Sequence, residues 1–275
     1  MGKNPYTRPK KRSDIRLYFG KKYFTFKKHL NLLFGNYKFA TKCNAMLPHP
    51  YFSHKTPLYR QLKDVDMYLQ TNKVVNLNIA VPKMNLATLN PGETFSFWQL
   101  IGKPTKGAGY QNGMVLKSGT VTAAIGGGLC QLSNLIYWMT IHTPLTVVER
   151  HRHGYDVFPD SNRTQPFGSG ATCFYNYGDL MIKNNTSHTF QLMLEITAEY
   201  LEGTWLCSSS PKSKYEVYEK EHVIQSQYWG GYTRHNLIHR KKYDSQGNLL
   251  EDEFVAENHA IMMYSPFITT TEVHS

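Results

Sequence analysis

The stretch AIGGGLCQLSNLIYWMTIHTP, residues 124–144, constrains the fold more than any other part of this sequence. Three consecutive glycines favour an irregular turn, because glycine adopts backbone conformations that are costly for other residues. From Cys130 onward, apolar side chains recur at the spacing of one helical face: Leu132, Leu135, Ile136 and Met139. Pro144 ends this pattern. The sequence therefore predicts a glycine turn followed by an amphipathic helix that begins at Cys130.

This turn has two interpretations. A thiol in the first turn of a helix faces unpaired N–H groups and the positive end of the helix dipole, which lowers its pKa and makes Cys130 a candidate nucleophile. The N–H groups of Gly126, Gly127 and Gly128 could then stabilise an oxyanion. Alternatively, Cys130 is a small buried hydrophobe, and the glycines allow close packing.

A base for this nucleophile is offered by the segment VVERHRHGYD. If residues 145–153 form a strand, Glu149, His151 and His153 point to one side of it, because side chains alternate along a strand. A carboxylate that orients an imidazole beside a thiol is the arrangement that thiol acyl transfer requires. We therefore predict Cys130 as nucleophile and His153 or His151 as base, with Glu149 as the carboxylate.

Metal binding is the competing chemistry. His151 and His153 could hold zinc together with Cys130 and Cys173, although the cysteines lack the compact spacing of zinc ligands. The segment HNLIH places two histidines four residues apart, but Asn236 stands where a zinc protease needs Glu. We interpret that segment as surface, and we expect neither a metal nor a cofactor.

The net charge of +11 belongs to the first 42 residues, which hold twelve Lys or Arg and one Asp, while the remaining charges balance. Within this basic arm, apolar residues recur at helical spacing: Tyr23, Phe26, Leu30 and Leu33. Such a helix either docks on the body with a solvated basic face or lies on an anionic membrane. We favour docking over membrane binding, and we do not expect nucleic acid as a partner.

The remaining pattern indicates an α+β protein, mainly antiparallel sheet, with N-terminal helices and a central helix from Cys130. We divide the chain into a basic amphipathic arm (1–45), a helical and strand lead-in (46–89), a core domain (90–207) and a C-terminal extension (208–275). In the lead-in we predict a helix over residues 58–70 and a strand over 72–81. Residues 219–264 read as an appended hairpin and tail.

The four cysteines lie far apart without a CxxC pair, which is typical of a reducing compartment. Lysines interrupt the first apolar stretch, so no signal-peptide core can be drawn, and no run approaches the length of a membrane span. The sequence therefore predicts a cytoplasmic protein, peripheral on the inner face of the membrane if the arm binds lipid. It carries no signal for an oligomeric state.

Four motifs together closely resemble the VanW family: NPGETFSFWQLIGKP, GGGLCQLSNLIYW, TPLTVVERHRHG and GDLMIKNNT. The resemblance implies a bacterial accessory role in glycopeptide (vancomycin) resistance and cell-envelope metabolism, with a peptidoglycan precursor as the expected substrate. Cys130, Gln131 and Ser133 match the family's Cys-Gln-x-Ser, which marks Gln131 and Ser133 as candidate substrate-binding residues. His151 and His153 match its Arg-His-x-His.

One position departs from the family pattern. Relatives often have Asp where this chain has Gly170, so another acid, such as Asp179, would have to orient the histidine. The alternative function is a non-catalytic binding module, in which Gly126, Gly127, Gly128 and the loop at 102–113 hold an anionic or cell-wall-derived ligand. A structural zinc protein is the third hypothesis.

Overall fold

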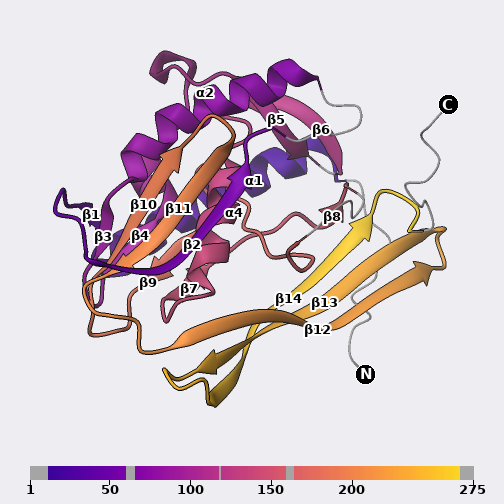
Figure 1. Ribbon diagram of the computed structural model, residues 1–275. Coiled ribbons are helices and arrows are strands. Elements are labelled where there is room, and N and C mark those ends of the chain that lie inside the picture. The colour runs from indigo at the N-terminus through magenta and orange to yellow at the C-terminus, as the bar shows by residue number, and fades with distance from the viewer. Residues whose placement is uncertain (1–11, 60–65, 118, 159–163, 267–275) are drawn as a thin grey trace.

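The computed structural model describes residues 12–59, 66–117, 119–158 and 164–266 (Figure 1). Its helices are α1 (Asp14–Phe34), α2 (Met67–Met84), α3 (Phe97–Ile101) and α4 (Cys130–Thr140), with a 3-10 helix at Lys106–Ala108. Its strands are β1 (Thr41–Lys42), β2 (His49–Pro57), β3 (Ala87–Leu89), β4 (Thr94–Ser96), β5 (Asn112–Lys117), β6 (Thr120–Ile125), β7 (Thr146–Glu149), β8 (Tyr155–Asp156), β9 (Met181–Lys183), β10 (Phe190–Ile196), β11 (Tyr200–Cys207), β12 (Lys214–Gln227), β13 (Gly231–Tyr243) and β14 (Leu249–Met262). Within these ranges, every strand pair is antiparallel except that of β8 with β14. The predicted α+β class is confirmed.

The largest sheet has the strand order β1-β3-β10-β11-β2, and α2 and α4 pack against it. Leu77 of α2 and Leu135 of α4 are fully buried in one hydrophobic core with Trp205 of β11. Burial of each such side chain contributes about 1.5–3 kcal/mol. The indole N–H of Trp205 donates to the hydroxyl of Thr140 at 3.1 Å, so its polar atom is satisfied inside the core.

Helix α4 begins at Cys130, as predicted. Gly126 and Gly128 have φ angles of +75° and +89°, in the left-handed region that favours glycine. The turn that they form delivers the chain to Leu129, the residue that precedes the helix. The helix ends at Thr140, shortly before Pro144. The glycine turn and the helix are therefore one local unit.

The strand predicted for residues 72–81 is wrong, because these residues form most of α2. The buried face of α2 has helical spacing but includes the polar residues Lys73 and Asn76. The Asn76 amide donates to the carbonyl oxygen of Gly127 at 2.9 Å and accepts from the N–H of Gln111 at 2.8 Å. Polar residues with such partners can occupy a buried face, but they interrupt the apolar spacing from which a helix is predicted.

The helix predicted for residues 58–70 falls largely on residues 60–65, which lie outside the described residues. Leu58 does not belong to a helix: it follows β2, and its N–H donates to the carbonyl oxygen of Glu199 at 2.7 Å. Only the last part of the predicted helix, from Met67, belongs to α2.

The strand predicted for residues 145–153 is shorter than expected. β7 ends at Glu149, where its pairing with β9 stops at Met181, and the register shifts between Val147 and Glu149. Beyond this point Arg150 turns away to donate to the carbonyl oxygen of Gly170 at 2.9 Å. His151 and His153 therefore lie after the strand, and strand alternation does not set their directions.

The C-terminal extension is larger than the predicted hairpin and tail. β12, β13 and β14 form a long antiparallel meander, and β8 adds to β14, giving a sheet of order β12-β13-β14-β8 (Figure 1). Arg240 of β13 ties this sheet to the body, because its guanidinium donates to the carbonyl oxygens of Ile141 and Thr143 at 3.2 and 2.7 Å. Arg150 makes a second tie to Asn258 of β14 at 3.2 Å.

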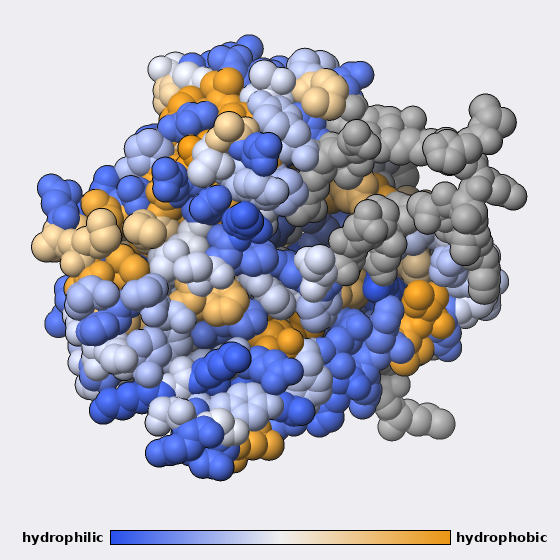
Figure 2. All heavy atoms as spheres, viewed as in Figure 1, coloured by the Kyte–Doolittle hydropathy of each residue, from blue (hydrophilic) through white to orange (hydrophobic). Residues whose placement is uncertain are grey.

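The basic arm contains the predicted helix, α1, whose first turn is capped by Ser13. Lys28 is its buried residue, and many of its large apolar side chains are exposed. On the face of the molecule seen in Figure 2, by contrast, hydrophobic residues form small separate patches among hydrophilic ones. Among the described residues, no helix combines the length and the apolar character that crossing a bilayer requires.

Candidate functional site

The glycines before Cys130 form a closed turn. The N–H of Gly126 donates to the carbonyl oxygen of Gln111, and that of Gly127 to Ala124, both at 3.0 Å. The predicted oxyanion donors at these two positions are thus engaged within the fold. At Gly128, a Cβ atom would lie 2.2 Å from Cγ of Lys73, so the turn packs directly on α2.

Cys130 stands at the start of α4, directly after the glycine turn. Burial raises the pKa of the Cys130 thiol, and the backbone N–H groups of Cys173 and of Cys130 itself only partly oppose this. Burial also raises the pKa of the neighbouring Cys173 thiol, and the nearness of Cys130 adds to the shift. The pKa of Cys130 is therefore shifted upward, whereas the helix dipole alone predicts a downward shift. Desolvation of the sulfur is the larger effect.

The two polar residues after Cys130 hold the helix in place. The Gln131 amide donates to the Thr56 hydroxyl and to the carbonyl oxygen of Pro57, both at 2.9 Å, which fixes α4 to the end of β2. The Ser133 hydroxyl is fully buried and donates to the carbonyl oxygen of Ala171 at 2.7 Å. Their side chains therefore bind protein groups in this structure.

The two histidines have different surroundings. His151 is hydrogen-bonded through Nε2 to Oε1 of Glu149 at 2.9 Å, so the predicted carboxylate–imidazole pair is present. The ring of His153 packs edge-on against Phe174, with centroids 5.7 Å apart, and burial lowers its pKa. Within the described residues, no hydrogen bond joins either imidazole to the sulfur of Cys130.

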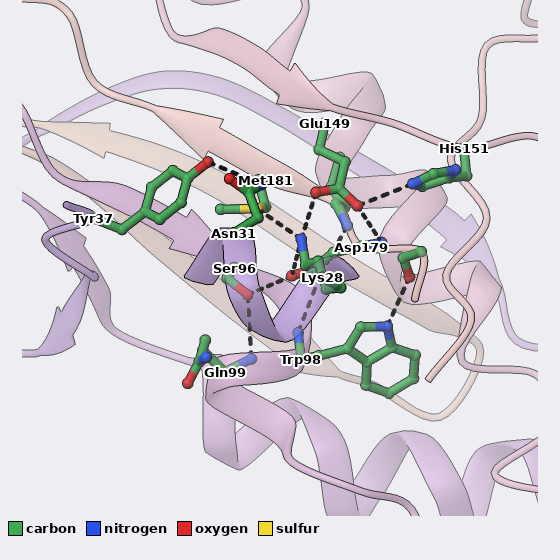
Figure 3. Close-up of polar contacts among 12 residues, drawn as sticks. Lys28, Asn31, Tyr37, Ser96, Trp98, Gln99, Glu149, His151, Asp179 and Met181 are labelled. Carbon is green, nitrogen blue, oxygen red and sulfur yellow. Dashed lines mark hydrogen bonds and ion pairs between the residues drawn. The ribbon is translucent and has the colours of Figure 1, made fainter. Parts of the chain in front are cut away.

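Glu149 is the centre of a partly buried polar cluster to which the N-terminal arm contributes (Figure 3). The ammonium group of Lys28, on α1, forms an ion pair with Glu149 and lies 3.8 Å from Oδ2 of Asp179. It also contacts the sulfur of Met181 at 3.1 Å. The side chain of Lys28 is 7% exposed, so α1 inserts a charged group into the body of the protein.

Asp179 is tied to the neighbouring elements by several donors. Its carboxylate accepts from the Ser96 hydroxyl at 2.5 Å and from the N–H of Trp98 at 3.2 Å, while its own N–H donates to Glu149 at 2.9 Å. The Trp98 indole donates to the carbonyl oxygen of Gly178 at 2.9 Å. One three-stranded sheet is formed by β4, β7 and β9. Glu149 is the last residue of β7, and Asp179 lies just before β9, so this sheet positions both carboxylates of the cluster.

The two carboxylates differ in their electrostatics. Burial opposes ionisation of Glu149, but hydrogen bonds from His151 and Lys28 outweigh it, so the pKa of Glu149 is lowered. Burial dominates at Asp179 and raises its pKa, against the opposing effects of Ser96 and Lys28. Of the two carboxylates, Glu149 is thus the one whose ionised form the surroundings favour.

Gly170, at which this chain departs from the family pattern, packs against α4. A Cβ atom on Gly170 would lie 2.6 Å from Oδ1 of Asn134, and the same oxygen accepts the N–H of Ala171 at 2.8 Å. Asp179, the suggested substitute acid, contacts Glu149 through its backbone, and in the part of the chain that the structure describes it forms no hydrogen bond with either histidine.

A cleft of about 310 Å³ opens beside Glu149, between the body and β14. It is lined on one side by Tyr137 of α4 with Glu149 and Arg150, and on the other by residues 255–257 of β14. The guanidinium of Arg150 lies over the Tyr137 ring, 4.5 Å from its centroid. The cleft therefore offers charge of both signs next to an aromatic surface.

The zinc site considered for Cys130, Cys173, His151 and His153 does not assemble in the described part of the chain, where no group of three metal-ligating side chains includes any of them. Of the cluster residues, Lys28, Ser96 and Trp98 carry no signal in the sequence. Lys28 is one of several lysines in the basic arm, and no sequence pattern distinguishes it from the others. The packing of α1 shows that Lys28 is the buried one.

Comparison of this sequence with known proteins identifies its family. The family described as VanW like protein matches residues 72–206. The vancomycin B-type resistance protein VanW of Enterococcus faecalis is 36% identical over 171 residues, which cover 62% of each chain. The uncharacterized protein YoaR of Bacillus subtilis is 30% identical over 109 residues, 40% of this chain and 34% of that protein.

The chain therefore spans less than two thirds of the length of these relatives. No solved structure shows significant similarity to it. The matched residues include Glu149, Asp179, both histidines and Cys130, whereas Lys28 lies outside them. On this basis, the chain belongs to the VanW family.

Proposed function

We propose that this protein is an accessory factor of glycopeptide resistance that binds an amine-bearing cell-wall precursor at Glu149. The connection to resistance rests on the similarity to the Enterococcus protein of that name. The observation that carries the site is the position of Lys28, whose ammonium group lies between Glu149 and Asp179.

Lys28 acts here as an internal stand-in for a ligand. The acidic slot is built from residues of the VanW-like region, while its occupant comes from the arm outside that region. Two carboxylates and a thioether sulfur around one ammonium group form a site for a primary amine. The adjoining cleft, with Tyr137 and Arg150, offers room and a cation for the peptide and carboxylate parts of such a ligand.

Binding of a stem peptide tests this proposal. The probe is a lysine-containing cell-wall pentapeptide, and the matched control is the same peptide acetylated on the lysine side chain. Lys28→Met frees the slot, so we expect this variant to bind the pentapeptide at least about tenfold more tightly than the wild type, since removal of a competing group removes its cost. Acetylation or the double change Lys28→Met with Glu149→Gln should abolish binding; equal affinity for both peptides would refute the amine slot.

A second candidate function, thiol acyl transfer, is favoured by the Glu149–His151 pair close to the loop that carries Cys173. In this reaction the Cys130 sulfur bonds to a carbonyl carbon while its proton passes to the imidazole, which then protonates the departing amine. Water hydrolyses the resulting thioester. Because burial raises the thiol pKa, the imidazole would have to remove the proton during attack.

Complementation separates the two functions in a bacterium whose growth in vancomycin depends on this chain. If the protein acts by binding, Cys130→Ala retains resistance and Glu149→Gln loses it. If it acts by acyl transfer, Cys130→Ala and Cys130→Ser both lose it. Circular dichroism and equal protein levels control for folding.

We also propose that α1 lies on the anionic inner face of the membrane. With 100° between successive residues, the side of α1 opposite Lys28 is an apolar stripe. Its members are 37–77% exposed: Ile15, Phe19, Tyr23, Phe26, Leu30 and Leu33. A docked helix normally turns its apolar side inward, so an outward stripe marks an interaction surface.

The charge of the arm is complementary to anionic lipid. Lys22 and Lys27 border the stripe and are exposed, and each basic residue near such a surface contributes about 1 kcal/mol. Because Lys28 points to the other side, α1 can bind lipid and stay docked at the same time. The Glu149 cluster would then be held close to the bilayer.

A further inference from the structure

Three metal-ligating side chains meet on the outer face of the C-terminal sheet. His235 of β13 stands directly opposite His259 of β14, and Glu257 precedes His259 by two residues, on the same face of that strand. Their neighbours Asn236 and Asn258 are buried toward the body, where Asn236 donates to the carbonyl oxygen of Phe167 at 2.6 Å. Alternation therefore directs His235, Glu257 and His259 away from the body, on the two middle strands of the sheet (Figure 1).

The ligand atoms already converge. Oε1 of Glu257 lies 3.1 Å from Nε2 of His235 and 2.9 Å from Nε2 of His259, and the three atoms lie within 4.8 Å of one another. The two imidazoles stack with centroids 4.3 Å apart and planes 14° apart. Tetrahedral zinc with bonds of about 2.0–2.1 Å needs ligand atoms about 3.3–3.4 Å apart. Oε1 of Glu257 lies near this distance from both nitrogens, and the stacked rings have to turn for both Nε2 atoms to face one ion.

The charge and exposure of the cluster suit a dication. Glu257 brings a carboxylate to the cluster, and its Oε1 lies within hydrogen-bond distance of both imidazole nitrogens. The side chains of His235, His259 and Glu257 are 17%, 37% and 52% exposed, which leaves a path for an ion from solvent. Neutral imidazole and carboxylate are borderline ligands of the kind that zinc prefers.

We propose that His235, Glu257 and His259 bind one Zn²⁺ ion. Zinc bonds to Nε2 of each imidazole in the tautomer that carries its single proton on Nδ1. Three protein ligands leave a fourth position for water or for a group of a bound molecule. The ion also links β13 to β14 through side chains, so it stabilises the C-terminal sheet by its binding free energy.

Zinc titration of the purified chain, after removal of metal with a chelator, tests the proposal. We expect one Zn²⁺ per chain by calorimetry and by elemental analysis, with a dissociation constant in the micromolar range or below. His235→Ala and His259→Ala should each weaken binding by about 100-fold or more, and Glu257→Gln by a smaller factor, since a neutral amide remains a weak ligand. Zinc should raise the melting temperature of the wild type and leave that of His259→Ala unchanged.

His239→Ala is the matched control. His239 lies on the same strand and contacts the carboxylate of Asp252 at 3.1 Å, but only the His235 cluster forms a three-ligand group in the described residues. This variant should bind zinc as the wild type does. The proposal is overturned if the wild type binds no zinc, if His235→Ala and His259→Ala bind it normally, or if Cys130→Ala abolishes binding instead. Melting temperatures of the metal-free variants, equal to that of the metal-free wild type, control for folding.

Discussion

The carbonyl oxygen of Gly113 lies only 2.0 Å from the position that a Cβ atom on Gly127 would occupy. The contact is mutual, because a Cβ atom on Gly113 would lie 2.3 Å from the carbonyl oxygen of Gly127. The start of β5 and the turn before α4 therefore touch backbone to backbone, and the amide of Asn76 binds both sides of the contact. This contact explains why glycine stands at position 127.

Gly127→Ala should destabilise the protein by about 3 kcal/mol, because backbone atoms cannot move aside as a flexible side chain can. The free energy of unfolding in urea measures the loss. Gly154→Ala is the control, since a Cβ atom there has no neighbour within 4 Å. Equal stability of the two variants would show that the contact between Gly113 and Gly127 is not a tight one.

Local patterns in the sequence are sufficient to predict α4, the α+β class and the helix of the basic arm. These elements depend on residues close together in the chain, such as the glycine turn and the apolar face that follows it. The assignment of residues 72–81 failed, because Lys73 and Asn76 are buried through partners such as Leu58 and Gly127, which the spacing of apolar residues does not reveal.

The candidate site was predictable only in part. Glu149 and His151 lie two residues apart, and their contact follows from that closeness. Lys28 and Asp179 join them from positions 121 and 30 residues away from Glu149 along the chain, through the docking of α1 and the pairing of β7 with β9. Such contacts are set by tertiary packing and leave no local pattern.

Alkylation of the cysteines should follow their exposure. Because burial raises the pKa of Cys130, less of its thiol is ionised at a given pH, and at pH 7 it should react more slowly than the exposed Cys43. Mass spectrometry of peptides after iodoacetamide treatment, at a series of pH values, measures both rates in one sample. Preferential labelling of Cys130 at pH 7 would instead indicate an activated thiol and favour acyl transfer.

The Glu149–Lys28 pair should stabilise the protein in a pH-dependent way. The pKa of Glu149 is lowered in the folded state, so its contribution is present above the unfolded pKa and is lost as the pH falls through the folded value. Glu149→Gln should therefore cost about 2 kcal/mol at pH 7, less than a fully buried pair because the side chain is 21% exposed. The difference from the wild type should shrink below about pH 4.

Asp179 contributes with the opposite sign, since its pKa is raised. The charge of Glu149 is one cause of that rise, so Glu149→Gln also lowers the pKa of Asp179, which offsets part of the loss. A double-mutant cycle with Lys28→Met isolates the pair. Once Lys28 is replaced, Glu149→Gln should cost less than in the wild type. Additive effects of the two changes would mean that the ion pair adds no stability.

Membrane binding should depend on the outward stripe of α1. The wild type should sediment with phosphatidylglycerol vesicles and much less with phosphatidylcholine vesicles, and salt should weaken binding by screening. Phe26→Ser should weaken it by about tenfold, because an exposed aromatic side chain on the stripe no longer enters the interface. Phe254→Ser is the control: Phe254 lies on β14 and is 60% exposed, against 63% for Phe26. If both variants bind like the wild type, α1 does not bind lipid through its stripe, and its apolar side must face a different partner.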